Sequence, residues 1–329
     1  MEPTVDNLTL PNNTNNVLLG NDTSLKLKTL KFFFPFWPVK VFKTVTGICV
    51  LAALLGLSIL LNLFKVPIVA GITISFAWLP GIIIGWYFGP VVGLLMGFVI
   101  DTINWLIYGG IWFWLYALQE PFLGLIIGLI SGMFMLVQQT KYHFKLTIIL
   151  NQVFFLCFLL VSIFIVFYYT DPNNPMFNKL SGSGIKNTLA IANQYLKWVI
   201  LALLLAVFGI VEGIMIYQLV TYNKVANKDV SKFETYSFVI IIVLTSTVIF
   251  SFLLGPISAV EYYKFINNVT QVPNLINYGV IYYLLPRVIK ECFKTPIYIA
   301  ILSVLICALN PTLINLKNRL LNSYHTKES

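Results

Sequence analysis

The sequence predicts an all-α, polytopic integral membrane protein. The chain of 329 residues is 58% hydrophobic and only 10% charged, with a mean hydropathy of +0.86. Soluble domains carry about 25% charged residues, so this composition indicates a membrane environment. Several apolar runs reach roughly 20 residues, the length that a helix needs to cross a bilayer.

Eight spans are expected from these runs. They are placed at about residues 44–64, 76–88, 91–108, 113–137, 146–168, 197–220, 237–254 and within 276–309. The second and third spans are separated by a tight turn, because Gly-Pro pairs such as Gly89-Pro90 interrupt helices. The last apolar region contains Pro286 and Pro296, which predict a kinked or split helix.

The connecting segments are polar or irregular. Residues 1–30 lack periodicity and predict a disordered tail, and the aromatic, proline-rich residues 31–40 predict an interfacial belt. Residues 66–79 predict a short re-entrant or extended piece, and residues 256–275 a long polar connection. Most Lys and Arg residues fall in inner segments if both termini are cytoplasmic, so this orientation is expected.

Charge and motifs exclude several function classes. The net charge of +9 is explained by lysines on the cytoplasmic side of a membrane, so no nucleic acid partner is expected. The four cysteines lie in apolar runs without metal-ligand or disulfide spacing. The sequence contains no GxSxG, HExxH or phosphate-binding loop, and its two histidines lie in polar segments. We therefore expect no enzyme activity, metal or cofactor, and ATP hydrolysis would need another subunit.

The stretch from Phe88 to Trp105 combines close packing with a charge. Gly89, Gly93 and Gly97 lie four residues apart, which lets a neighbouring helix approach closely in lipid. Asp101 follows inside the apolar run, where a carboxylate is costly and marks a candidate site.

Other charged residues lie at the same expected depth. Glu120 in the fourth span and Arg287 and Lys290 in the last one would share the outer half of the membrane with Asp101. They could form ion pairs that hold helices together or surround a polar ligand, and both interpretations stay open. Glu291 and Lys294 are interpreted as structural or snorkelling residues.

Aromatic residues gather at this level as well. Trp105, Trp112 and Trp114 lie in one short stretch, and Trp78 lies in the irregular piece before the second span. This pattern is typical of an interfacial belt, or of a wall on which a flat heteroaromatic ligand stacks.

Four motifs in order resemble the substrate-binding S component of energy-coupling factor (ECF) vitamin transporters, in particular its folate-type branch. They are Ala52-Ala53-Leu54-Leu55-Gly56-Leu57-Ser58, Ile74-Ser75-Phe76-Ala77-Trp78-Leu79-Pro80, Phe88-Gly89-Pro90-Val91-Val92-Gly93 followed by Asp101, and Leu284-Leu285-Pro286-Arg287-Val288-Ile289-Lys290 with Pro296-Ile297.

The resemblance implies a six-helix core that is divided along the chain. Core helices 1–4 fall within residues 42–137 and core helices 5 and 6 within 236–310, while residues 138–235 would be an inserted helix pair with its loops. Residues 1–41 and 311–329 would be cytoplasmic tails.

The resemblance also implies partners and roles. Ala52 and Gly56 would dock on the coupling transmembrane subunit, which works with two ATPase subunits in the cell (plasma) membrane. The substrate would be a vitamin, most simply folate. Its rings would stack on Trp78, Trp105, Trp112 or Trp114, its pterin edge would bind Asp101 or Glu120, and its carboxylates would pair with Arg287 or Lys290.

Three alternatives remain open at this stage. The vitamin could be riboflavin, thiamine or another compound. The chain could be a stand-alone secondary transporter that moves protons through Asp101 and Glu120, although it shows no inverted repeats. A membrane enzyme or assembly factor is disfavoured by the missing catalytic motifs.

Overall fold

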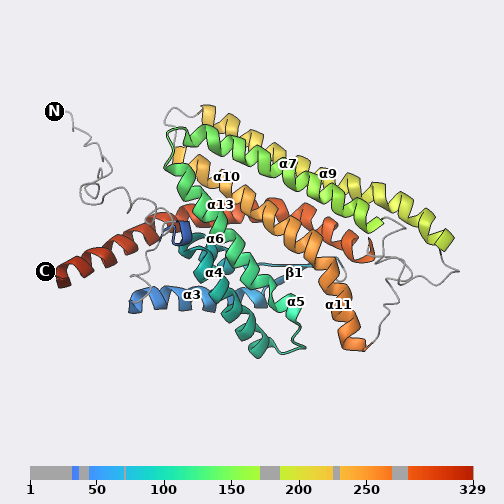
Figure 1. Ribbon diagram of the computed structural model, residues 1–329, viewed down its shortest axis with the longest axis horizontal. Coiled ribbons are helices and arrows are strands. Elements are labelled where there is room, and N and C mark those ends of the chain that lie inside the picture. Colours follow the sequence, from blue (N-terminus) through green and yellow to red (C-terminus); the bar gives the residue numbers. More distant parts are fainter. Residues whose placement is uncertain are drawn as a thin grey trace, which may run out of the picture.

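The computed structural model describes residues 32–36, 44–69, 72–170, 186–224, 230–268 and 281–328. Their regular elements are α3 (Val45–Leu63), β1 (Lys65–Val69), β2 (Ile72–Ser75), α4 (Trp78–Tyr108), α5 (Trp114–Ala117), α6 (Gln119–Gln138), α7 (His143–Thr170), α9 (Lys186–Lys224), α10 (Val230–Ser246), the π-helix η1 (Thr247–Leu254), α11 (Gly255–Asn267) and α13 (Ile281–Glu328). In Figure 1, α7 and α9 run side by side along one edge of the bundle and α3 lies on the opposite side.

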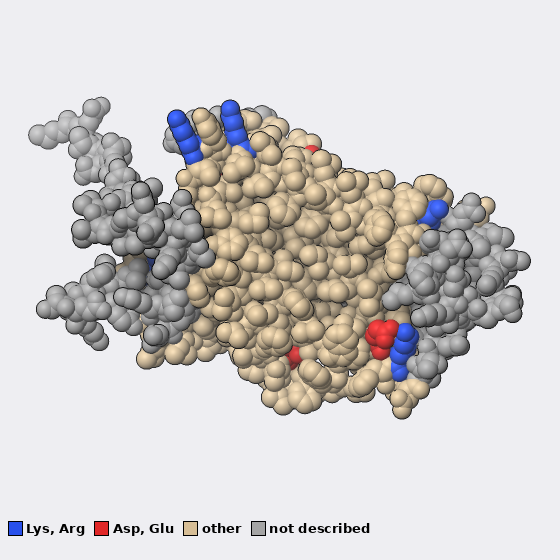
Figure 2. Space-filling model, in the orientation of Figure 1, with Lys and Arg blue, Asp and Glu red and all other residues tan. Residues whose placement is uncertain are grey.

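Seven helices in this part of the chain are long and apolar enough to cross a membrane. Figure 2 shows a broad band of the visible face with almost no charged side chains, while Lys and Arg lie toward its ends. A protein surface that faces the hydrocarbon core of a bilayer has to be apolar in this way. The expectation of an all-α polytopic bundle is therefore confirmed.

Helix α4 reverses its direction at Gly89, which has non-helical angles of φ 87° and ψ 180°. Gly85 and Gly93 both pack against the backbone of Gly124 on α6, although they lie eight residues apart. Farther from the turn, Gly81 and Gly97 both lie beside Glu120 of the same helix. The two arms of α4 thus flank α6, and the turn expected at Gly89-Pro90 is confirmed.

Only glycine permits this arrangement. Gly89 has a φ of 87°, a backbone conformation that is strained for any residue with a Cβ. A Cβ at Gly85 would lie 2.7 Å from the carbonyl oxygen of Gly124, and one at Gly97 would lie 2.5 Å from the backbone of Pro121. The glycine spacing read from the sequence therefore serves backbone-to-backbone packing of α4 on α6.

A short antiparallel hairpin, β1–β2, connects α3 to α4 and confirms the extended piece expected near residues 66–79. Its end is tied to the bundle by two hydrogen bonds. The hydroxyl of Tyr298 on α13 donates to the carbonyl of Ser75, and the hydroxyl of Ser58 on α3 donates to the carbonyl of Ala77 at 3.3 Å. These hydrogen bonds hold the end of the hairpin beside α13, and Trp78, which follows it, therefore lies next to α13.

Two sequence expectations are corrected. Residues 256–267 were expected in a polar connection, but they continue the helix Val230–Asn267. Pro256 lies at the junction where the π-helix η1 passes into α11. The last region was expected to be kinked or split, and it is not split, because α13 runs as one helix through Pro286, Pro296 and Pro311. Neighbouring helices make such prolines tolerable in membrane helices.

The segment Phe32–Phe36 packs under the turn of α4. The ring of Phe36 lies 5.9 Å from Trp86, 5.5 Å from Tyr87 and 6.3 Å from Phe134, measured between ring centroids. The remaining residues of the expected tail at 1–41 lie outside the described ranges. The expected C-terminal tail from 311 continues α13 as far as Glu328.

Candidate functional site

The centre of the bundle contains a buried ion pair on α13. The ammonium of Lys294 lies 3.1 Å from Oε1 of Glu291, and their side chains are 7% and 0% exposed. The other oxygen of Glu291 accepts hydrogen bonds from the hydroxyls of Thr247 (3.2 Å) and Thr295 (3.4 Å). Both carboxylate oxygens are thus satisfied, as a buried charge requires.

Two aromatic rings hold the other side of Lys294. Its Nζ lies 4.9 Å from the ring centroid of Trp78 and 4.8 Å from that of Tyr298. Both distances suit cation–π attraction. The indole of Trp78 in turn packs edge-on against Phe250 of η1 at 5.9 Å. Elements α4, η1 and α13 therefore meet at this lysine.

Glu120 lies in the first turn of α6, beside the first arm of α4. Its Oε2 is buried and has no hydrogen-bond partner, and a Cβ on Gly81 would lie 3.3 Å from it. Asp101, on the second arm of α4, is close enough to interact electrostatically with Glu120. The indole of Trp112 lies within hydrogen-bond reach of Asp101. The two expected acids are therefore neighbours.

Lys290 and Arg287 lie about one and two turns, respectively, toward the N-terminus of α13 from Lys294. The guanidinium of Arg287 reaches the hydroxyl of Tyr116 on α5 and lies against Gly255, where a Cβ would be 2.5 Å from Nη1. Within the described residues, neither Arg287 nor Lys290 has a carboxylate at ion-pair distance. Tyr298 of α13 links the two sides of the bundle, because both Glu291 of α13 and Glu120 of α6 lie close enough to interact electrostatically with its hydroxyl.

Of the four tryptophans expected to form an aromatic wall, two have described contacts with charged residues. Trp112 is near Asp101 and Trp78 is beneath Lys294. Trp105 donates its indole N–H to the carbonyl of Gly110 at 3.1 Å and is 40% exposed, while Trp114 is 54% exposed. No described contact links Trp105 or Trp114 to the charged residues.

Sequence reasoning did not select Glu291, Lys294, Tyr116 or Tyr298 as site residues. The i, i+3 spacing of Glu291 and Lys294 on one helix was the available signal, because such neighbours face each other. Of the two roles expected for Lys294, structural or snorkelling, its buried contacts with Glu291 and Trp78 fit the structural one. Glu212 of α9 accepts a hydrogen bond from Gln152 of α7 at 3.2 Å.

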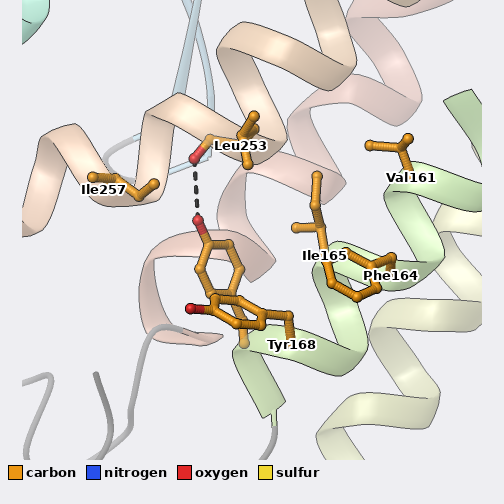
Figure 3. Close-up of a pocket in the computed structure, with 7 residues that line it drawn as sticks. Val161, Phe164, Ile165, Tyr168, Leu253 and Ile257 are labelled. Atoms are coloured by element: carbon orange, nitrogen blue, oxygen red, sulfur yellow. Dashed lines mark hydrogen bonds between the residues drawn. The ribbon is translucent and has the colours of Figure 1, made fainter. Parts of the chain in front are cut away.

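A separate hollow lies between α7 and the η1–α11 segment (Figure 3). Its volume is about 320 Å³, and it is lined by Val161, Phe164, Ile165, Tyr168, Tyr169, Leu253 and Ile257. The hydroxyl of Tyr169 donates to the carbonyl of Leu253 at 3.2 Å across it. Because none of these side chains carries a charge, the hollow differs in chemistry from the charged region. Among the described residues, no group of three or more His, Cys, Asp or Glu side chains could hold a metal ion.

The sequence model of the family "ECF transporter, substrate-specific component" matches residues 46–222, which is more than half of the chain. The chain belongs to this family. The match begins in α3, includes both arms of α4 and ends in α9. This protein is therefore a membrane-embedded S component, a class of transporter subunit and not a class of enzyme.

Two relatives cover nearly the whole S component. "Uncharacterized protein MG313" of Mycoplasma genitalium is 32% identical over 289 residues, covering 88% of this chain and 97% of its own. "Uncharacterized protein MG313 homolog" of Mycoplasma pneumoniae is 30% identical over 274 residues, covering 83% and 93%. No solved structure matches the chain.

The family match includes part of the segment 138–235 that is predicted to be an insertion between core helices. It continues through α7 and most of α9, the pair that the motifs alone predict to be an insertion. The assignment of residues 138–235 as an insertion, with core helices on both sides, stays a prediction.

Proposed function

We propose that this S component binds folate in the charged region between α4, α6 and α13, and delivers it to an ATP-driven ECF importer. The observation that carries the proposal is that Oε2 of Glu120 is buried without a hydrogen-bond partner, while Arg287 and Lys290 have no carboxylate at ion-pair distance among the described residues. Unpaired charges at membrane depth are costly, and a ligand of complementary charge removes that cost.

Folate has the matching chemistry. A pterin edge presents adjacent N–H donors, which a carboxylate such as Glu120 or Asp101 accepts. The glutamate end is anionic and would pair with Arg287 and Lys290, which lie on one face of α13. Trp78 and Trp112 adjoin these charges and offer faces for ring stacking, while Trp105 and Trp114 would complete the wall at the outer end.

The proposal is tested by titrating purified protein with folate while following tryptophan fluorescence. We expect Arg287→Ala to weaken folate binding by about 10- to 100-fold, the usual effect of losing a charge-assisted hydrogen bond. Lys264→Ala is the matched control, because Lys264 is paired with Glu261 at 2.7 Å near the C-terminal end of α11, whereas Arg287 lies against Gly255 at its start. Unchanged affinity in Arg287→Ala would remove this residue from the site.

Docking would use the outer face of α3. Ala52 is exposed, and nothing lies within 4 Å of a Cβ placed on Gly56. Small residues four apart let a partner helix approach closely in lipid. A coupling subunit, itself joined to two ATPases, would pack on this face in the plasma membrane, with both termini of the S component in the cytoplasm.

Two other functions draw on the same residues. Riboflavin or thiamine could replace folate in a pocket of this type. The neighbouring carboxylates Asp101 and Glu120 would also suit a stand-alone, proton-coupled carrier. Co-purification with an ATPase pair and a coupling subunit favours the importer, whereas uptake by the isolated chain in liposomes, driven by a proton gradient, favours the carrier.

A further inference from the structure

A second large hollow lies between α9, α10 and α13, away from the charged region. Its volume is about 650 Å³, within the range of small-molecule sites. It is lined by Ile214, Tyr217, Gln218, Thr221, Tyr222, Lys232, Phe233, Tyr236, Pro296, Ile299, Ala300, Ser303 and Val304, and we call it the α9–α13 groove.

The lining positions show that the groove runs along the helix axes. On α9 they recur from Ile214 to Tyr222, and on α13 from Pro296 to Val304, in each case at helical spacing on one face. Eight residues of helix correspond to a length of about 12 Å. Small residues on α13, such as Ala300 and Ser303, face aromatic residues of α9 and α10. This shape suits a chain-like apolar ligand.

The groove opens to the membrane. Tyr217 is 70% exposed and Val304 is 69% exposed, and both belong to helices long and apolar enough to span a bilayer. The aromatic trio of Phe144, Tyr222 and Phe233, with centroids 4.9–5.1 Å apart, closes the side toward α7. A ligand therefore enters from the lipid phase.

One end of the groove is positively charged. Lys232, near the start of α10, is exposed and lines the groove. Lys141 and Lys145 are exposed at the same end of the bundle, because His143 of α7 pairs with Glu234 of α10 there. Glu234 itself is 2% exposed, so its carboxylate faces inward to His143. The surface at this end therefore attracts anions.

We propose that the α9–α13 groove binds an anionic phospholipid. An acyl chain lies along Pro296, Ala300 and Val304, and the phosphate lies at Lys232. Basic pockets between membrane helices are known to recognise acidic lipid headgroups, and apolar walls hold the attached chain. This site is independent of the vitamin site, because the two share no residue.

The test is native mass spectrometry of the full chain released from nanodiscs containing equal amounts of phosphatidylglycerol and phosphatidylcholine. The wild-type protein is expected to retain phosphatidylglycerol in preference. Lys232→Gln should lower the ratio of the two retained lipids by about fivefold, the effect of one lysine near an anionic headgroup. Lys197→Gln is the matched control, because Lys197 lies on α9 seventeen residues before Ile214 and does not line the groove, so the ratio should stay near its original value.

A second variant tests the chain-binding part. Ala300→Phe should fill the groove and reduce retention of both lipids, whereas Ala206→Phe, at an exposed alanine of α9 outside the groove, should not. Equal retention of both lipids by the wild type, or no change in Lys232→Gln, would overturn the proposal. Folate titration of the same samples reports the vitamin site separately, so failure of one proposal leaves the other measurable.

Discussion

At the scale of single residues, Lys294 shows how a charge can be held inside a membrane bundle. It has one carboxylate partner, Glu291, and two aromatic faces, those of Trp78 and Tyr298. Glu291 receives two further hydrogen bonds from threonines. Glu291 also interacts electrostatically with Arg287 and Lys290, but neither cation lies at ion-pair distance from it, which leaves both as groups that would attract an anionic ligand.

Breaking this pair should be costly, whereas replacing both partners should not be. Lys294→Met leaves the carboxylate of Glu291 buried without its cation, and we expect the free energy of unfolding to fall by about 3–5 kcal/mol. The double variant Glu291→Gln with Lys294→Met should recover most of that loss, because no charge remains. Denaturant unfolding in detergent measures both. Equal losses in the single and double variants would contradict this account of the pair.

The sequence revealed which residues carry charge at membrane depth, but not how they pair. Asp101, Glu120, Arg287 and Lys290 were placed at one level from span lengths alone, and the structure brings Asp101 beside Glu120. The partners of Lys294 could not be predicted in this way. Trp78 reaches the lysine only because the β1–β2 hairpin is tied to α13 through Ser75, a contact between residues more than 200 positions apart.

At the scale of elements, the packing of α4 around α6 depends on glycine. Gly124 lies against the backbone of Gly93 on one arm of α4. Its carbonyl oxygen also lies where a Cβ on Gly85 of the other arm would point. Because both neighbours are backbone atoms, neither can move aside without displacing a helix. The sequence predicted this element well, since glycine spacing and the Gly-Pro pair are local signals.

Gly124→Ala should therefore destabilise the protein strongly. We expect a loss of about 2–5 kcal/mol, comparable to other overpacking and backbone changes in a tight core. Gly213→Ala on α9 is the control, because nothing lies within 4 Å of its Cβ, and it should be neutral or gain up to about 1 kcal/mol of helix propensity. Thermal unfolding in detergent compares them, and similar melting temperatures would show that α4 and α6 are not packed in this way.

Helix α3 is the least covered span, with 11% of its most apolar window buried. Gly56→Leu should block the proposed docking face, so vitamin uptake by the assembled importer should fall at least tenfold while folate affinity stays unchanged. Ala53→Leu, which changes an adjacent exposed position of α3 outside the Ala52–Gly56 pair, is the control. Normal uptake by Gly56→Leu would show that the coupling subunit binds elsewhere.

Some elements could not be read from composition. The π-helix Thr247–Leu254 lies inside one apolar run, and its first residue, Thr247, donates a hydrogen bond to Glu291 of α13. The polar residues of α11, such as Glu261 and Lys264, predict a loop, although they lie in a helix. They pair with each other at 2.7 Å on the helix surface, as i, i+3 neighbours do.

At the scale of the whole molecule, the charged region and the α9–α13 groove occupy different parts of one helical bundle. The charged region joins α4, α6 and α13, and the groove joins α9, α10 and α13. Helix α13 therefore contributes to both. The family match covers residues 46–222, so it identifies the transporter class without including α13, which carries the proposed cations.

The central claim is that this S component binds folate. The most direct measurement is equilibrium binding to the purified wild-type protein by calorimetry, with folate, riboflavin and thiamine as separate ligands. The account predicts saturable, tight binding of folate that neither riboflavin nor thiamine displaces. Tight binding of another vitamin with no response to folate, or no binding of any of the three, would contradict it.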